Sequence, residues 1–265
     1  MTSLAGPETA AHYERLAGSY DHNWSHSGAF LGWMAHAIAS SLALSAADRI
    51  ADVGCGTGLF TRRIRDLVHP SSPVLCVDPS AAMLAQLPAD PGLQPLRASA
   101  EELARGRPAS AGPTTAHGSL DAIIVKEAIH HVADVDRRWV IAGLADLLGV
   151  RGRLLVVMLP TRIEYPLFDA ALERFESLQP APDVIADHMR KAGLSASVTY
   201  HDFPLEIPKG RYLAMVRDRY MSLLATFDDV EIEAGLAEID RRHTEKILSF
   251  PDRFAFVLGA REGNR

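Results

Sequence analysis

Short runs of consecutive apolar residues, separated by stretches of helical periodicity, begin at the segment DRIADVGC near residue 50. Runs that are apolar at successive positions are typical of strands covered on both faces, and alternation of strands with helices predicts a parallel sheet. The strand at 94–99 is predicted from its position as much as from its composition. The predicted strands span residues 50–53, 73–78, 94–99, 120–126, 152–159, 195–207 and 253–260.

Helical periodicity fills the intervals between these strands. The crossover helices, which right-handed connections would place on both faces of the sheet, are predicted at 58–68, 80–87, 100–105 and 135–148. Two further helices precede the first strand, at 8–20 and 28–44, and four follow the fifth, at 165–178, 181–192, 210–226 and 229–248. The pattern predicts an α/β protein with a seven-stranded, mostly parallel sheet.

The composition is that of one globular domain, since 48% of the 265 residues are hydrophobic and 23% are charged. A net charge of −6 counts against a nucleic-acid partner. The longest apolar runs are far shorter than the roughly 20 residues that cross a bilayer, and the first residues do not read as a secretory signal. Only Cys55 and Cys76 are present, which suits a reducing compartment. We expect a cytoplasmic protein with neither a membrane nor a nucleic-acid partner.

The stretch ADVGCGTGLF follows the first predicted strand and places Gly54, Gly56 and Gly58 in a turn that opens a helix. Glycines permit positive φ and let a ligand approach the main chain, while the helix presents unpaired N–H groups. Asp78 ends the next strand, where an acid can hydrogen-bond ribose hydroxyls. The spacing therefore predicts a nucleoside site.

Two residues beside this turn distinguish among nucleoside ligands. Leu59 stands where the dinucleotide fingerprint requires a third glycine, so the turn is not built around a pyrophosphate. Asp52 precedes the turn, and a carboxylate there repels a phosphate but accepts hydrogen bonds from an ammonium group. A ligand with a ribose and a cationic end fits, and S-adenosylmethionine is such a ligand.

The motifs resemble those of class I S-adenosylmethionine-dependent methyltransferases, in particular the small-molecule branch that includes methyltransferase type 11 and trans-aconitate-like enzymes. IADVGCGTG resembles the first motif, VDPSAAML the second, ASAEEL the third, and LDAIIVKEAIHHVAD the fourth, in order along the chain. Ser99 departs from the third motif, where many members carry an aspartate. The resemblance implies a Rossmann-like class I methyltransferase fold, with S-adenosyl-L-methionine as cofactor and S-adenosyl-L-homocysteine as its product. The cofactor-binding residues are then Tyr20, Asp52, Gly54, Cys55, Gly56, Gly58, Asp78, Pro79, Met83, Ser99, Ala100, Glu101 and Lys126.

The resemblance also implies a division of one methyltransferase domain into three parts. Residues 1–45 form an N-terminal helical cap, and residues 46–204 with 251–265 form the Rossmann-like core. Residues 205–250 form a helical insertion before the last strand, which resembles the substrate lid of small-molecule methyltransferases. We expect a monomer or a homodimer.

The stretch VKEAIHHVAD lies at the carboxyl end of the fourth predicted strand, where open α/β sheets bind ligands. Adjacent histidines point in different directions and no Cys or carboxylate cluster completes a ligand set, so no metal is expected. His130 and His131 are candidate catalytic bases, because the imidazole pKa lies near the operating pH. An equally weighted alternative is that they only pack the cofactor loop. Lys126 would repel a sulfonium, so its side chain should turn away, pair with Glu127 or hold an anionic substrate.

Five residues are candidates for contact with the methyl acceptor: Glu127, Arg162, Tyr165, Tyr212 and Arg219. The guanidinium groups of Arg217 and Arg219 could clamp a carboxylate, but helix-surface arginines more often meet solvent or local acids. Tyr20, with Asp21, resembles the Tyr-Asp pair that closes over the cofactor in many small-molecule methyltransferases, although a lone aromatic more often packs a helix.

Three functions remain open at this point. The first is methyl transfer to a small molecule, with oxygen favoured because two histidines suit assisted deprotonation, as in natural product biosynthesis. The second is a protein or nucleic-acid methyltransferase, which the acidic charge disfavours. The third is a protein that binds the cofactor but regulates, or catalyses a cyclisation or rearrangement.

Overall fold

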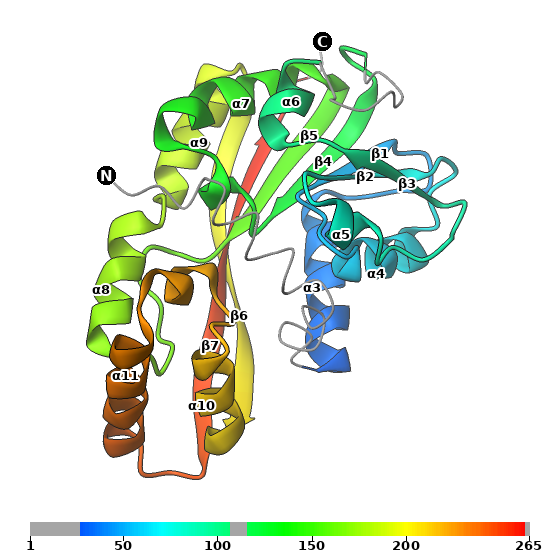
Figure 1. Ribbon diagram of the computed structural model, residues 1–265. Coiled ribbons are helices and arrows are strands. Elements are labelled where there is room, and N and C mark those ends of the chain that lie inside the picture. The colour runs from blue at the N-terminus through cyan, green and yellow to red at the C-terminus, as the bar shows by residue number, and fades with distance from the viewer. Residues whose placement is uncertain (1–26, 107–115, 263–265) are drawn as a thin grey trace.

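The computed structural model describes residues 27–106 and 116–262, which contain one seven-stranded sheet with the order β3-β2-β1-β4-β5-β7-β6 (Figure 1). The strands β1 to β5 are parallel, whereas β7 is antiparallel to both of its neighbours. The predicted seven-stranded, mostly parallel sheet is therefore confirmed. The strands are β1 Ile50–Val53, β2 Val74–Asp78, β3 Leu93–Arg97, β4 Leu120–Lys126, β5 Leu148–Met158, β6 Ser195–Pro208 and β7 Ile247–Ala260.

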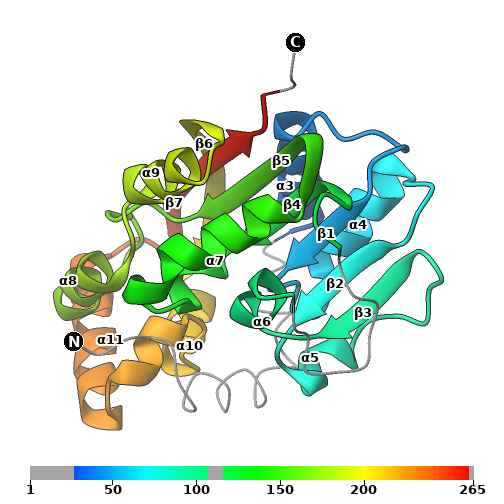
Figure 2. The ribbon, with the colours of Figure 1, turned by 90° about the horizontal axis from the view of Figure 1, so that it is seen from above.

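Helices cover both faces of the sheet, as predicted. They are α3 Gly28–Ser41, α4 Leu59–Val68, α5 Ala81–Leu84, α6 Ala100–Ala104, α7 Asp134–Asp146, α8 Asp169–Leu178, α9 Pro182–Lys191, α10 Lys209–Arg217 and α11 Asp229–Arg242, with short 3-10 helices η1 Ile129–His131 and η2 Ser222–Thr226. Figure 2 shows α7 and α9 over one face, and α3 and α4 over the other. The predicted helix at 8–20 lies outside the described residues.

Two hydrophobic cores lie on opposite faces of the sheet, and β4 divides them. Ala122 and Ile124 belong to the core beneath α3 and α4, whereas Ile123 and Val125 belong to the core beneath α7 and α9. Successive residues of a strand point to opposite faces. A strand buried on both faces must therefore be apolar at every position, which is why these strands could be found in the sequence.

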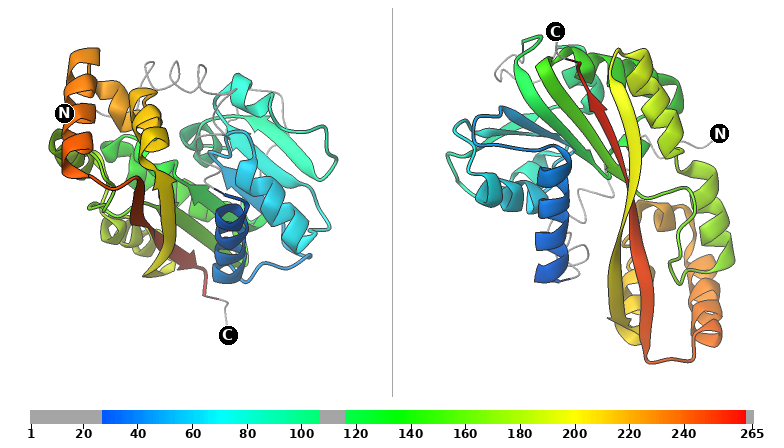
Figure 3. Two further views of the ribbon diagram at one scale, coloured as in Figure 1. Left: turned by 90° about the horizontal axis from the view of Figure 1, so that it is seen from below. Right: turned by 180° about the vertical axis from the view of Figure 1, so that it is seen from behind.

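The largest departure from the predicted elements is at the last strand. β7 begins at Ile247 rather than at residue 253, and the preceding helix α11 ends at Arg242 rather than at residue 248. The extra residues continue the antiparallel pairing with β6 as far as Pro208 opposite Ile247, and Leu248 is buried. A long two-stranded extension thus projects from the sheet with α10 and α11 beside it (Figure 3).

Two other predicted helices have different bounds in the structure, and in each the backbone conformation of one residue explains the difference. The predicted helix at 210–226 divides into α10 and η2, because Arg219 between them has φ of 53°, which an α-helix cannot contain. The predicted helix at 165–178 begins only at Asp169. Pro166 follows Tyr165, and a residue that precedes proline avoids the helical region.

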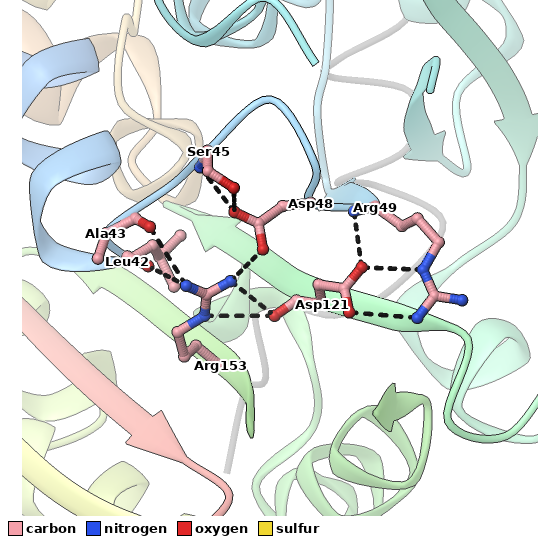
Figure 4. A network of polar contacts seen from close by, with 7 residues as sticks. All are labelled: Leu42, Ala43, Ser45, Asp48, Arg49, Asp121 and Arg153. Carbon is pink, nitrogen blue, oxygen red and sulfur yellow. Dashed lines mark hydrogen bonds and ion pairs between the residues drawn. The ribbon is translucent and has the colours of Figure 1, made fainter. Parts of the chain in front are cut away.

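A polar network fastens α3 to the amino-terminal edge of the sheet (Figure 4). The Arg153 guanidinium donates to the Leu42 carbonyl at 2.7 Å and to the Asp48 carboxylate at 2.5 Å. Beside it, Arg49 donates through Nε to Asp121 Oδ2 at 2.8 Å. Carbonyl groups at the carboxyl-terminal end of a helix lack partners within the helix, and Arg153 supplies such a partner for α3. Within the described ranges, no helix has the length and apolar character to span a bilayer.

Candidate active site

The carboxyl-terminal edge of β1, β2 and β4 brings together the glycine turn, Asp78 and the segment that begins at Lys126. In a parallel sheet these strand ends lie side by side, as the pairing of Val53 with Val77 and of Asp52 with Ile124 shows. Open α/β sheets bind ligands at this edge. The predicted cofactor residues in the described chain, which come from separate motifs, thus meet at one place.

The turn after β1 requires glycine for two reasons. Gly54 and Gly58 have φ of 77° and 73°, which L-residues rarely adopt. A Cβ at Gly54 would lie 2.4 Å from the Cβ of Ala128, and one at Gly58 would lie 2.3 Å from Cδ2 of Leu87. Gly54 is therefore pressed against the segment that follows β4. This close approach brings the cofactor turn against the candidate catalytic segment.

Asp78 is held by main-chain donors and is almost completely buried. Its Oδ2 accepts from the Gly56 N–H and its Oδ1 from the Ser80 N–H, both at 2.9 Å. Burial raises its pKa, although both N–H donors favour the charged form. A carboxylate has about four lone-pair sites. Two remain for ribose hydroxyls, so the residue fits its predicted role.

Asp52 has a partner within the fold. It is 4% exposed, and the Thr61 hydroxyl donates to its carboxylate. Burial raises the pKa of Asp52 to about 6, against the effects of the Thr61 hydrogen bond and the Lys126 charge. Its contact with a ligand ammonium group stays a prediction.

The remaining predicted cofactor residues have unequal surroundings. Met83 is buried in α5, whereas Pro79 is exposed before it. The Ser99 hydroxyl accepts from the Glu102 N–H in a capping box, so Ser99 caps the amino-terminal end of α6. Cys55, Ala100 and Glu101 are half-buried. Tyr20 and Asp21 lie outside the described residues.

The two histidines form the short helix η1 and contact one another, with ring centroids 4.0 Å apart. Burial lowers the pKa of His130 well below its usual value, and the charges of His131, Arg137 and Lys126 lower it further. Its Nδ1 is buried and has no hydrogen-bond partner among the described residues. His130 is therefore neutral at pH 7, and an imidazole whose pKa is lowered is a weaker base than a free one.

Lys126 turns its ammonium group onto aromatic rings. The Nζ atom lies 4.2 Å from the ring centroid of Phe60 and 5.6 Å from that of Phe254. Burial lowers its pKa, whereas the charges of Glu127, Asp252 and Asp52 raise it. Cation–π contact of this kind is favourable.

Glu127 has an unusual backbone, with φ of 50°, and its Oε1 accepts from the Leu159 N–H at 2.9 Å. Its pKa is raised to about 7, mainly by burial. The nearby Asp252 carboxylate raises it further, whereas the Lys126 charge lowers it. A non-glycine residue with positive φ is uncommon, and such positions gather at functional sites.

The sequence analysis missed Asp252. This residue has 0% of its surface exposed, and the Tyr165 hydroxyl donates to its Oδ1. Burial raises the pKa of Asp252 to about 6, although Tyr165 and Lys126 favour the charged form. The stretch FPDRFAF carries a signal that could have revealed it, because an acid among alternating aromatic residues of a strand faces the core. The predicted strand began one residue too late to include it.

The predicted acceptor residues do not converge. Tyr165 is buried against Asp252, and Tyr212 is buried with its hydroxyl 3.4 Å from that of Tyr220. The Arg162 side chain is 83% exposed and binds Glu176, and Arg219 binds Asp229 at 2.7 Å. The two arginines thus meet local acids, the alternative that the sequence left open.

The comparisons with known proteins agree with this site. Residues 51–154 match the family model described as a methyltransferase domain. The match begins in β1 and ends within β5, so it contains the glycine turn, Asp78 and the segment after β4. Together with the fold, it confirms the resemblance to class I S-adenosylmethionine-dependent methyltransferases and supports S-adenosylmethionine as the cofactor. No curated protein matches the chain by sequence.

Solved structures share the fold at low sequence identity. A putative methyltransferase from an antibiotic biosynthesis pathway of Anabaena variabilis is 18% identical, with a TM-score of 0.63 over 85% of this chain and 96% of that one. YcgJ from Bacillus subtilis is 17% identical, with a TM-score of 0.57 over 88% and 98%. The 4+2 cyclase SpnF is 13% identical, with a TM-score of 0.56 over 88% and 81%.

Proposed function

We propose that the protein transfers a methyl group from S-adenosylmethionine to a small-molecule acceptor, with oxygen as the favoured accepting atom. The observation that carries this proposal is the glycine turn pressed against Ala128, with Asp78 presenting its remaining lone pairs beside it. Asp78 would bind the ribose, and the main chain of the turn would lie beside it. When bound, the cofactor supplies an electrophilic methyl group on a positively charged sulfur atom.

The protein contributes position, exclusion of water and a place for the acceptor's proton. The Phe60 ring and the neighbouring carboxyl groups take up the charge of Lys126, which reduces its repulsion of a sulfonium cation. A small acceptor is supported by the acidic net charge of −6, which disfavours nucleic acid. Natural product biosynthesis is the setting that we infer from the family branch, and the insertion at 205–250 would cover the acceptor.

A second candidate is a reaction without methyl transfer, because the fold is shared with the cyclase SpnF. Incubation with methyl-labelled S-adenosylmethionine and a panel of phenols, carboxylic acids, amines and activated carbon acids distinguishes the two. Label in an acceptor establishes methyl transfer. Tight cofactor binding with no label in any acceptor, but with a rearranged product, would favour the cyclase-like candidate.

Cofactor binding is tested by titration calorimetry with S-adenosylmethionine and S-adenosylhomocysteine. Asp78→Ala should weaken both affinities at least about tenfold, because ribose hydroxyl bonds to a charged group contribute roughly 1.5–3 kcal/mol. Asp187→Ala, which removes an exposed partner of Arg190 on α9, is the matched control and should leave both unchanged. Wild-type affinity in Asp78→Ala would refute the ribose role. A chain that ignores both ligands but takes up a nicotinamide or flavin would refute the proposed function.

A further inference from the structure

Asp252 and Lys126 lie at the same edge and on the same face of the sheet, although they are far apart in sequence. Lys126 pairs with Val157, which pairs with Phe256 of the antiparallel β7. Asp252 precedes Phe256 by four residues, so it lies beyond the carboxyl end of β5. Alternation along β7 places Asp252 on the face of Phe254, whose ring lies beneath the Lys126 ammonium.

The groups around Asp252 come from three separate segments of the chain. Tyr165, from the loop before α8, donates its hydroxyl to the carboxylate. Lys126 at the end of β4, Glu127 after it and Tyr220 after α10 are close enough that their charges and that of Asp252 affect one another's pKa. The ammonium group of Lys126 lowers the pKa of three carboxyl groups, those of Glu127, Asp252 and Asp52. The cluster thus has an excess of acid, with Asp252 fully buried and Glu127 half-buried.

The protonation of this cluster should respond to an added positive charge. Burial raises the pKa of Asp252 to about 6 and that of Glu127 to about 7, so near neutrality the pair retains part of a proton. A cation brought close favours the charged form of a carboxyl group. Titratable groups of coupled sites lose protons as a set. The lowered pKa of His130 makes it the weaker base at this edge.

We propose that Asp252 and Glu127 form the proton-accepting centre of the methyl-transfer site, and that arrival of the sulfonium cation drives them into their charged form. This inference rests on the proposed function. As the acceptor's lone pair forms the bond to the methyl carbon, the acceptor's proton passes to a carboxylate oxygen of the pair. The electrons of the breaking carbon–sulfur bond stay on sulfur as a neutral thioether. The proton stays on the pair once the positive charge has gone, and the arrival of the next sulfonium cation expels it to solvent.

The two cofactor forms provide a test that requires no acceptor. S-adenosylmethionine and S-adenosylhomocysteine share the same amino, carboxyl and ribose groups and differ in the charge at sulfur. Titration calorimetry at pH 6.5, repeated in phosphate and in imidazole buffer, measures the protons released by the full chain on binding each ligand. We expect the charged ligand to release about half a proton more per site than the neutral one.

Isosteric variants test whether Asp252 and Glu127 cause this difference in the number of protons released. Asp252→Asn and Glu127→Gln should each lower the difference by at least about half, because each removes one titrating group. Asp202→Asn, on the partner strand and paired with the exposed Arg253, is the matched control and should keep the wild-type difference. Thermal unfolding of each variant checks that it is folded.

The outcomes separate this inference from the proposed function. If both ligands bind and release equal numbers of protons, or if both carboxyl variants keep the wild-type difference, the inference is overturned while the proposed function stands. If neither ligand binds, the proposed function itself fails. With the first acceptor that the labelling panel identifies, Asp252→Asn should lower turnover about a hundredfold at pH 7. Wild-type turnover in both carboxyl variants would place the proton elsewhere and also overturn the inference.

Discussion

The two ends of β4 carry polar clusters built from similar residue types in different surroundings. At the amino-terminal edge Asp121 meets Arg49, and Arg153 meets Asp48, so that each carboxylate has its own guanidinium. At the carboxyl-terminal edge the ammonium group of Lys126 is set against three carboxyl groups, those of Glu127, Asp252 and Asp52. Matched charges stabilise a structure, whereas an unmatched and buried set is suited to move protons.

The pKa directions follow the same division. The Arg49 hydrogen bond holds the pKa of Asp121 below its usual range, and this carboxyl lies near the surface. Burial instead raises the pKa of Asp252 and of Glu127. Folding therefore favours the charged form at one edge and the neutral form at the other. Environment, rather than residue type, separates a structural cluster from a candidate catalytic one.

Removing Arg153 should have the largest effect on stability. Arg153→Met leaves the Asp48 carboxylate and the Leu42 carbonyl without this donor, and breaking a mostly buried pair costs about 4 kcal/mol. Urea unfolding measures the loss, and Arg190→Met, in an exposed pair with Asp187, is the control with little change. The folded variant should bind S-adenosylmethionine normally. Weakened binding in a folded Arg153→Met would show that the two edges are coupled.

Whereas Arg153→Met should lower the stability of the protein, Asp252→Asn should make it more stable relative to wild type as the pH rises. Between its ordinary pKa of 3.8 and its folded value of about 6, the folded protein holds a proton that the unfolded chain releases. The wild type thus loses stability as the pH rises through this window, and asparagine avoids that loss. The free energy of unfolding of Asp252→Asn relative to wild type should rise by about 2–3 kcal/mol between pH 4 and pH 7.

Urea unfolding of both proteins across this pH range measures the difference. Asp121→Asn is the matched comparison, because its lowered pKa predicts a relative loss that grows as the pH rises above its folded value. A pH-independent difference for Asp252→Asn would show that this carboxyl is not neutralised by folding. The contrast between the two edges would then fail.

Strands β1 and β4 could be predicted from the sequence because most of their positions are apolar and buried. The runs at 50–53 and 120–126 coincide with β1 and β4. The glycine turn and Asp78 could be found too, since a backbone that needs positive φ and a strand that ends in an acid are local features. Features that depend only on neighbouring residues in the sequence could therefore be predicted without the structure.

The acid cluster could not be predicted, because it depends on long-range pairing. Asp252 meets Tyr165 across 87 positions, and its burial follows from how far β7 continues along β6. The predicted helix at 229–248 includes residues 247 and 248, which in the structure belong to β7. The lowered pKa of His130 could not be predicted either, because it depends on burial by segments that only the fold brings together.

His130→Ala tests whether the imidazole or the carboxyl groups accept the proton at the carboxyl-terminal edge of the sheet. We expect turnover to fall by at most about tenfold, because a half-buried imidazole with a lowered pKa is a poor proton acceptor. The acceptor found by the labelling panel serves for the assay, and cofactor affinity should change less than about twofold. The exposed His36 provides the control variant His36→Ala. A loss of a hundredfold or more would return the role of base to the imidazole, as one interpretation of the sequence had it.

Arg162→Ala should have the smallest effect on stability and cofactor affinity, because Arg162 lies in neither of the two polar clusters. Its side chain is 83% exposed and bonds to Glu176 at 2.7 Å, and exposed pairs of this kind contribute less than about 1 kcal/mol. Stability and cofactor affinity should both stay near wild type, by urea unfolding and calorimetry, with the exposed Arg190→Ala as control. A tenfold rise in KM for a carboxylate acceptor, with stability unchanged, would place Arg162 at the acceptor site, as the sequence predicted. It would also show that exposure in this structure does not exclude a residue from the acceptor site.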